Sequence, residues 1–515
     1  DDNGYDISDY REIMREFGTM EDFDRLLKEI HKREMRLVLD LVVNHTSDEH
    51  PWFEEARKSR HNPYYNYYHW WPAEKGEPPL RLSYFDEEGN AWTYNKPTDS
   101  YYLHYFSRKQ PDLNWENPEV RQEIFDMMRF WFDKGIDGFR MDSISLIAKD
   151  PSFPLIDSKK YPDIFSFYAK EPRLHLYLHE MNRQVLSKYD CMSVGEGSAV
   201  MVDDVAKFVD PAREELNMLY HFDAARIRNT TLPDNPESGI DYSLIALKKM
   251  FTEWDKAVDK GWPSIYLGNH DQPRMVSRFG SDKDEFRALS AKMLITFLLT
   301  MKGTPYWFAG DEIGMRNIRF DRIEDYNDID TINRYKKAKA EGKDPQAVLD
   351  EQKETGRDNA RTPFQWDRSP EAGFTAGTPW LKVNPDYTWI NVADEEKDPT
   401  SILNYFKKVV SFRKENLSLI YGSYHLLDAE NPQSYTFLRK TGADTYLIML
   451  NFSPKAAIST PGIDMSNAHV LLDNYGDRSH MAPQKDITLR PFEAIVFQLN
   501  HPVYESFIDS LDLLE

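Results

Sequence analysis

The chain has 515 residues, enough to bury a large core and to form two or three domains. Its 64 basic and 86 acidic residues give a formal net charge of −22, which argues against nucleic acid or an anionic membrane as a partner. No apolar run approaches the roughly 20 residues that span a bilayer. The single cysteine, Cys191, excludes an internal disulfide and a cysteine-based zinc site. These totals predict a globular protein of a reducing compartment, the cytoplasm.

The N-terminal part of the sequence predicts one helix and one strand, followed by an irregular region. Residues 19–34 have the apolar spacing of an amphipathic helix, and residues 35–43 form the apolar run of a buried strand that ends in Asn44 and His45. Residues 46–110 are rich in aromatic residues and proline and lack long periodic segments. We interpret this region as a subdomain inserted into the main fold.

After residue 110 helices and strands alternate. Asn117 and Pro118 form a good helix start. Further strands are predicted at 135–144, 192–196, 216–222, 263–269 and 304–309, and helices at 173–188, 242–260 and 284–301. Strands that alternate with helices predict parallel βαβ units, as in a (β/α)8 TIM barrel. Six strands can be counted, and an open six-stranded sheet would leave two exposed edges. We therefore expect the first two barrel strands to lie outside this sequence, before Asp1.

The C-terminal part differs from the preceding regions in its pattern of residues. Short β-branched and aromatic runs from about residue 422 predict an antiparallel β domain, a sandwich. Residues 316–353 are highly charged and helical in their second half, and we interpret them as a solvated face without chemistry. The predicted domains are a barrel formed by 1–45 and 111–421, an inserted subdomain at 46–110, a β domain at 422–500 and a tail at 501–515.

Polar side chains follow several of the predicted strands. They are Asn44, His45, Asp142, Glu196, His270, Asp271, Asp311 and Glu312. The carboxyl ends of barrel strands are the usual place of an active site. Arg140 and Asp142 alternate along one strand, so their side chains share a face. A cation there favours the ionised carboxylate that a nucleophile requires.

Five segments, in this order, resemble the conserved regions of glycoside hydrolase family 13, the α-amylase family, and most closely its α-glucosidase and oligo-1,6-glucosidase branch. They are residues 40–45, the Gln-Pro-Asp-Leu-Asn segment at 110–114, residues 138–142, residues 194–196 and the Asn-His-Asp segment at 269–271. The resemblance covers nearly the whole chain. It implies a (β/α)8 barrel with an inserted subdomain and a C-terminal β-sandwich, and a retaining exo-α-glucosidase acting on small sugars.

The resemblance also implies residue roles. Asp142 would be the nucleophile that forms a covalent glucosyl ester, and Glu196 the general acid and then the base. Asp271 would be a third carboxylate that binds sugar hydroxyls and helps to keep Glu196 protonated. The implied substrate-binding residues are Asp2, Tyr5, His45, Phe85, Arg140, His270 and Arg357, with Asp2 and Arg357 paired at the closed end of the pocket and Tyr5 stacked under the glucose. No cofactor is required and no metal ligand is expected among these residues, although a structural calcium ion could bind the missing N-terminal segment.

Ser143, directly after Asp142, departs from the residues usual in this branch. A side chain there would contact the leaving sugar, so it leaves open whether α-1,6 bonds of isomalto-oligosaccharides, our main expectation, or α-1,4 bonds are preferred. Two further alternatives remain. The first is a transglucosylase or sucrose isomerase on the same fold. The second is a non-catalytic amylase-like binding protein, similar to the ectodomains of amino-acid transporter heavy chains, which carry a membrane span and lack the three carboxylates.

Overall fold

The computed structural model describes residues 4–85, 89–157, 159–161, 165–223, 242–442, 444–479, 481 and 484–499. By its internal contacts the chain divides into two compact units. The first consists of Asp1–Phe222 and Ala257–Trp262, and the second of Asp223–Lys256 and Pro263–Glu515. This division is no test of the predicted domain boundaries, which stay a prediction. Asp2 and the tail at 501–515 lie outside the described residues.

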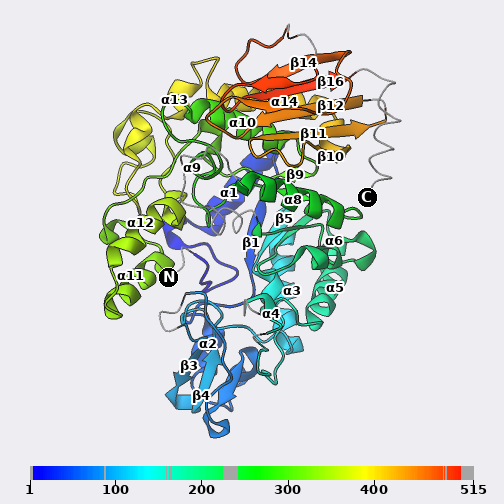
Figure 1. The fold of residues 1–515 in the computed structure, drawn as a ribbon. Helices are drawn as coiled ribbons and strands as arrows, with labels where there is room; N and C mark the ends of the chain where they lie inside the picture. Colours follow the sequence, from blue (N-terminus) through cyan, green and yellow to red (C-terminus); the bar gives the residue numbers. More distant parts are fainter. Residues whose placement is uncertain are drawn as a thin grey trace. The chain divides into compact units, whose positions relative to one another are not determined.

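The first unit is organised around a four-stranded parallel sheet with the strand order β1-β5-β6-β7 (Figure 1). These strands are β1 (Val38–Val42), β5 (Gly138–Asp142), β6 (Met192–Glu196) and β7 (Met218–Tyr220). The register pairs Val42 with Asp142 and Glu196 with Tyr220. Because parallel strands end at the same edge of a sheet, Asp142 and Glu196 are brought to one edge, as the βαβ pattern predicted, together with Tyr220, which the sequence did not single out.

The helices of the first unit follow the signals in the sequence. They are α1 (Met20–Lys32), α2 (Pro51–Ala56), α3 (Pro118–Lys134), α4 (Phe165–Tyr168), α5 (Arg173–Gln184) and α6 (Val205–Val209). Thr19 and Asp22 form a capping box that starts α1. The Asn117 side chain caps α3 by accepting a hydrogen bond from the Glu119 amide, as predicted. Satisfied amides at these first turns fix where each helix begins.

The irregular region contains a small antiparallel sheet with the order β2-β4-β3. Its strands are β2 (Trp70–Pro72), β3 (Trp92–Asn95) and β4 (Ser100–Leu103). Aromatic rings hold it together: Tyr65 stacks on Trp70 with ring centroids 4.8 Å apart, and Tyr105 stacks on Tyr168 at 3.9 Å. The aromatic composition therefore serves the core of this region.

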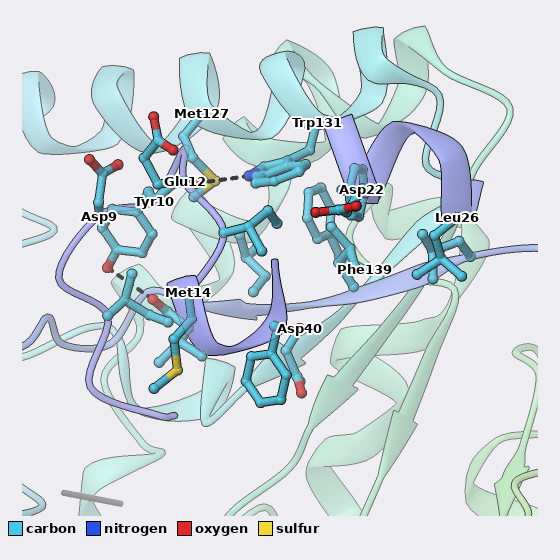
Figure 2. A pocket seen from close by; sticks show the side chains of 18 of the residues that line it. Asp9, Tyr10, Glu12, Met14, Asp22, Leu26, Asp40, Met127, Trp131 and Phe139 are labelled. Carbon is cyan, nitrogen blue, oxygen red and sulfur yellow. Dashed lines mark hydrogen bonds between the residues drawn. The ribbon is translucent and has the colours of Figure 1, made fainter. Parts of the chain in front are cut away.

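Strand β1 lies beside an apolar cavity of about 440 Å³ (Figure 2). Within the described residues β1 pairs on one side only, with β5. Leu39 and Leu41 of β1, Leu26 of α1 and Trp131 of α3 line the cavity, and Phe17 at its rim is 77% exposed. An unpaired strand edge beside apolar side chains is a surface that another strand can cover.

The second unit contains a short parallel pair and a larger antiparallel sheet. The pair is β8 (Ser264–Ile265) with β9 (Thr304–Pro305). The larger sheet has the order β10-β11-β12-β16-β14, and β13 pairs with β15. These strands are β10 (Ser423–Leu427), β11 (Ser434–Thr441), β12 (Asp444–Asn451), β13 (Ala457–Ser459), β14 (Ala468–Asp473), β15 (Ile487–Leu489) and β16 (Ala494–Leu499). Side chains from both sheets share one apolar core, including Leu438, Leu447 and Ile487.

The helices of the second unit are α8 (Tyr242–Ala257), α9 (Met275–Phe279), α10 (Arg287–Thr300), α11 (Ile329–Ala340), α12 (Pro345–Thr355), α13 (Val392–Glu395), α14 (Ile402–Glu415) and α15 (Ser418–Tyr421). The charged segment 316–353 is helical in its second half, as predicted, because α11 and most of α12 lie there. Across the part of the chain that the structure describes, no helix is both long enough and apolar enough to span a bilayer.

Candidate active site

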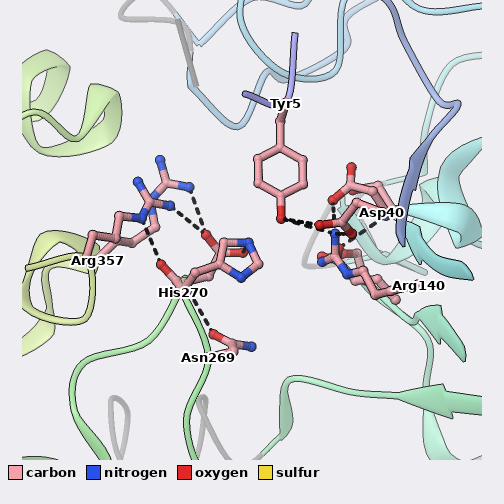
Figure 3. Close-up of polar contacts among 12 residues, drawn as sticks. Tyr5, Asp40, Arg140, Asn269, His270 and Arg357 are labelled. Atoms are coloured by element: carbon pink, nitrogen blue, oxygen red, sulfur yellow. Dashed lines mark hydrogen bonds and ion pairs between the residues drawn. The ribbon is translucent and has the colours of Figure 1, made fainter. Parts of the chain in front are cut away.

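Arg140 is the centre of a hydrogen-bonded group at the carboxyl edge of the parallel sheet (Figure 3). Its Nη1 donates to Asp142 Oδ1 at 2.6 Å and to Asp40 Oδ1 at 2.9 Å. Its Nη2 donates to Glu196 Oε2, and its Nε donates to the Tyr220 hydroxyl at 2.8 Å. The prediction that Arg140 and Asp142 share a face is confirmed. One planar guanidinium thus bridges the proposed nucleophile and the proposed general acid.

The two carboxylates Asp142 and Glu196 are buried, whereas Asp40 at the edge of the group is exposed. Asp142 is 7% exposed, and burial raises the pKa of its carboxyl to about 6, although Arg140 acts to lower it. Burial acts to lower the pKa of Arg140, but the negative charges of Glu196 and Asp142 outweigh it and raise that pKa. Arg140 therefore stays charged, and Asp142 is mostly ionised at neutral pH. The sequence predicted the cation's influence but not the larger opposing effect of burial.

Glu196 is held by two further contacts that the sequence reasoning did not identify. Besides Arg140, its carboxylate accepts hydrogen bonds from the Ser198 hydroxyl at 2.9 Å and from the Ser143 amide at 3.2 Å. Ser143 has a φ of 43°, in the left-handed region that residues with a side chain rarely adopt. Such a backbone persists only where its surroundings fix it. The strained turn directs the amide after the nucleophile toward the neighbouring carboxylate.

Tyr5 and His45 lie together in the first unit. His45 Nε2 is 2.9 Å from the Tyr5 carbonyl oxygen, and the Tyr5 hydroxyl donates to Asp40 Oδ2 at 3.2 Å. The Arg140 guanidinium lies over the Tyr5 ring, 5.6 Å from its centroid. Phe85 is linked to His45 through Phe106: the Phe85 ring packs on the Phe106 ring, and the Phe106 ring packs on His45. The structure thus groups three predicted substrate-binding residues, Tyr5, His45 and Arg140.

Lys149 forms a buried ion pair that ties the loops around β1 together. Its ammonium is 3.1 Å from Asp112 Oδ2 and donates to Asn44 Oδ1 at 2.6 Å. Burial raises the pKa of Asp112 and lowers the pKa of Lys149. The Lys149 charge acts to lower the pKa of Asp112, and the Asp112 charge acts to raise the pKa of Lys149, but burial is the larger effect on both. Asn44 and Asp112 belong to conserved segments of the resemblance, whereas Lys149 had no signal in the sequence. The pair joins residues 110–114 to the end of β1.

A second charged group lies in the second unit (Figure 3). Arg357 donates through Nη1 to Asp271 Oδ1 at 3.1 Å and through Nη2 to Asp328 Oδ1 at 2.6 Å. Arg361 donates to the same Asp271 oxygen at 2.9 Å and to the His270 carbonyl at 2.8 Å. The predicted residues His270, Asp271 and Arg357 therefore lie in one hydrogen-bonded group, in which Arg361 is the additional arginine.

Asp328 is an exception to the interpretation of the charged segment 316–353 as a solvated face. The Asp328 side chain is 1% exposed. One of its carboxylate oxygens caps α11 by accepting a hydrogen bond from the Thr331 amide, and the other accepts a hydrogen bond from Arg357. Burial acts to raise the pKa of Asp328, but Arg357 and Thr331 outweigh it and lower that pKa. The expected partner of Arg357, Asp2, lies outside the described residues, so that pair is not tested. A helix cap at Asp328 could have been predicted; its arginine partner, 29 residues away, could not.

Among the described residues, no group of three or more His, Cys, Asp or Glu side chains is placed to hold a metal ion. The functional groups that these side chains offer are carboxylates and guanidinium groups. Two carboxylates bridged by a guanidinium at the ends of parallel strands are suited to general acid–base and nucleophilic catalysis.

Residues 1–422 match the family described as the catalytic domain of α-amylase. The chain belongs to this family of glycoside hydrolases, as the motifs predicted. The family implies a (β/α)8 barrel followed by a C-terminal β-sheet domain.

Individual relatives are similar over nearly their whole length. The chain is 50% identical over 513 residues to an oligo-1,6-glucosidase of Parageobacillus thermoglucosidasius, covering 98% of this chain and 90% of the relative. It is 41% identical to a trehalose-6-phosphate hydrolase of Bacillus subtilis, covering 97% and 89%. Among solved structures, a mutant isomaltulose synthase of Erwinia rhapontici NX5, in complex with its natural substrate sucrose, matches with a TM-score of 0.91 and 41% identity, covering 97% and 89%.

Proposed function

We propose that the protein is a retaining exo-α-glucosidase that releases glucose from the non-reducing end of short α-glucosides, with α-1,6-linked isomalto-oligosaccharides preferred. The observation that carries this proposal is the bridging of Asp142 and Glu196 by Arg140 at the end of the parallel sheet. The 50% identity to an oligo-1,6-glucosidase over almost the whole chain supports it.

The chemistry follows from the two carboxylates. The Asp142 oxygen bonds to the anomeric carbon while the bond to the leaving sugar breaks, and Glu196 gives its proton to the departing glycosidic oxygen. Glu196 then takes a proton from water, the water oxygen attacks the anomeric carbon, and the ester bond to Asp142 breaks. Two inversions give glucose with retained configuration. Arg140 balances the negative charge of Asp142 in the free enzyme, and that of Glu196 in the intermediate, where Asp142 is a neutral ester.

The roles of the remaining residues stay proposals that rest on the family resemblance. Asp271, His270, His45 and Arg357 would bind sugar hydroxyls, with Tyr5 under the glucose ring and Asp2 and Phe85 as further contacts. The pairing of Arg357 with Asp328 supports the role of Arg357, because an arginine held by a buried carboxylate keeps one geometry. Asp328 would act through Arg357, as a positioning residue.

The first alternative is a sucrose isomerase or transglucosylase, in which a sugar instead of water intercepts the glucosyl ester. The structural match to an isomaltulose synthase favours it. A phosphorylated disaccharide, as the name of the Bacillus subtilis relative implies for that enzyme, fits this chain less well, because its net charge is −22. We do not adopt the non-catalytic alternative, since Asp142, Glu196 and Asp271 are all present.

The test is to measure glucose release from isomaltose, maltose, sucrose and trehalose side by side, with Asp142→Asn as the control. We expect isomaltose to be cleaved fastest and the variant to be inactive, with a loss of kcat of about 10⁴-fold or more. Conversion of sucrose without a matching amount of free glucose and fructose would establish the isomerase instead. Equal activity of Asp142→Asn and wild type would remove Asp142 as nucleophile.

The open edge of β1 supports an eight-stranded barrel. In such a barrel a further strand would pair with the side of β1 that is unpaired among the described residues and would cover the cavity lined by Leu39 and Leu41. The cytoplasmic location, a bound structural calcium ion and the lack of a nucleic-acid partner also stay predictions.

A further inference from the structure

Tyr220 is the last residue of β7 and pairs with Glu196 in the register of the sheet. Its hydroxyl accepts hydrogen bonds from Nε of Arg140 at 2.8 Å and from Nη2 of the same guanidinium. Its ring also lies 5.6 Å from the centre of that guanidinium. Burial raises the pKa of the Tyr220 hydroxyl well above its ordinary value, so it remains a neutral group. None of the motifs discussed above contains this residue.

The orientation of a planar guanidinium is set by all of its donors together. In Arg140, Nη1 binds Asp142 and Asp40, and Nη2 binds Glu196. These contacts fix one edge of the group, and the Tyr220 hydroxyl fixes the other edge through Nε. Without that anchor, a small rotation would bring the guanidinium closer to one carboxylate at the expense of the other. Simultaneous contact with both carboxylates therefore depends on Tyr220.

We propose that Tyr220 is a positioning residue for the reaction, whose hydroxyl holds Arg140 so that one nitrogen serves the nucleophile Asp142 and the other serves the acid/base Glu196. This inference rests on the proposed function. It adds that a neutral side chain on β7, the strand next to that of Glu196, keeps Arg140 in contact with both carboxylates. By comparison, the Tyr5 hydroxyl is 3.5 Å from Nη1 and lies at the edge that the carboxylates already fix.

The test compares Tyr220→Phe with Tyr177→Phe. Both substitutions remove a single hydroxyl and keep the ring, and the Tyr177 hydroxyl bonds to Glu116 in the same unit, outside this group. For Tyr220→Phe we expect kcat on isomaltose to fall about 10- to 100-fold with KM changed less than about threefold. We also expect the acid limb of kcat/KM to move upward by about half a pH unit, because a misplaced Arg140 opposes protonation of Asp142 less well. Tyr177→Phe should change neither quantity.

Thermal unfolding of both variants separates positioning from stability. The inference would be overturned if Tyr220→Phe lost activity while the acid limb of kcat/KM did not move and its melting temperature fell below that of Tyr177→Phe. Tyr220 would then have a structural role only. Wild-type kinetics in Tyr220→Phe would overturn it as well, and would leave the proposed function intact. If the wild-type protein itself releases no glucose from any α-glucoside, the proposed function fails and this inference fails with it.

Discussion

At the scale of single residues, Asp142 combines a buried position with a role that requires charge. Burial raises its pKa to about 6, against 3.8 for an ordinary aspartate. The proposed nucleophile is protonated below that pH and ionised above it. We therefore expect kcat/KM for isomaltose to be constant from neutral pH down to about pH 6 and then to fall about tenfold for each further pH unit. Rates measured between pH 4 and 8 test this.

Loss of folding at low pH would imitate such a profile, so a control is needed. Protein held at each acidic pH and returned to pH 7 should recover its full activity. An acid limb near pH 4, with the protein folded, would mean that the charge of Arg140 outweighs burial at Asp142, contrary to the structure.

The residues that the sequence did not identify share one property. Tyr220, Asp328 and Arg361 act through partners that are distant in sequence. Arg140 and Asp142 could be paired from the sequence because strand geometry places alternate side chains on one face. A partner across the sheet, such as Tyr220 for Arg140, depends on the strand order and register, which periodicity alone does not fix.

At the scale of elements, the six predicted strands are present, but two are much shorter than predicted. Residues 263–269 and 304–309 were expected as strands, whereas β8 and β9 pair over only two residues each. Apolar runs report burial, and Leu267 is indeed buried without belonging to a strand. The cap at Asn117 was easier to predict, because its side chain acts on an amide two residues away. Local hydrogen bonding is therefore readable from sequence, whereas the length of strand pairing is not.

The buried pair of Lys149 and Asp112 gives a prediction about how the elements are held together. Lys149→Met would leave the Asp112 carboxylate buried without its cation, which costs about 3 to 5 kcal/mol. We expect the free energy of unfolding in urea to fall by about that amount, and part of the loss to be recovered in the double variant with Asp112→Asn.

Lys207→Met is the matched control, because Lys207 pairs with Asp204 while 53% of its side chain is exposed. Its effect should stay within about 0.5 kcal/mol. If Lys149→Met were no more destabilising than this surface variant, the ion pair would not be what joins residues 110–114 to the end of β1.

At the scale of the whole molecule, the net charge of −22 bears on the choice of substrate. A neutral disaccharide feels no net force from this field, whereas a phosphorylated one is repelled before it binds. We expect kcat/KM for isomaltose to change less than about twofold between 20 and 500 mM NaCl, because screening affects only charged partners. For trehalose 6-phosphate we expect kcat/KM at least about tenfold below that of isomaltose, and rising with salt. Sodium and potassium chloride at equal ionic strength should give the same result. If trehalose 6-phosphate were instead the better substrate and lost efficiency as salt increased, a local cationic site would have to override the charge of the whole chain, and the preference for neutral α-glucosides would be wrong.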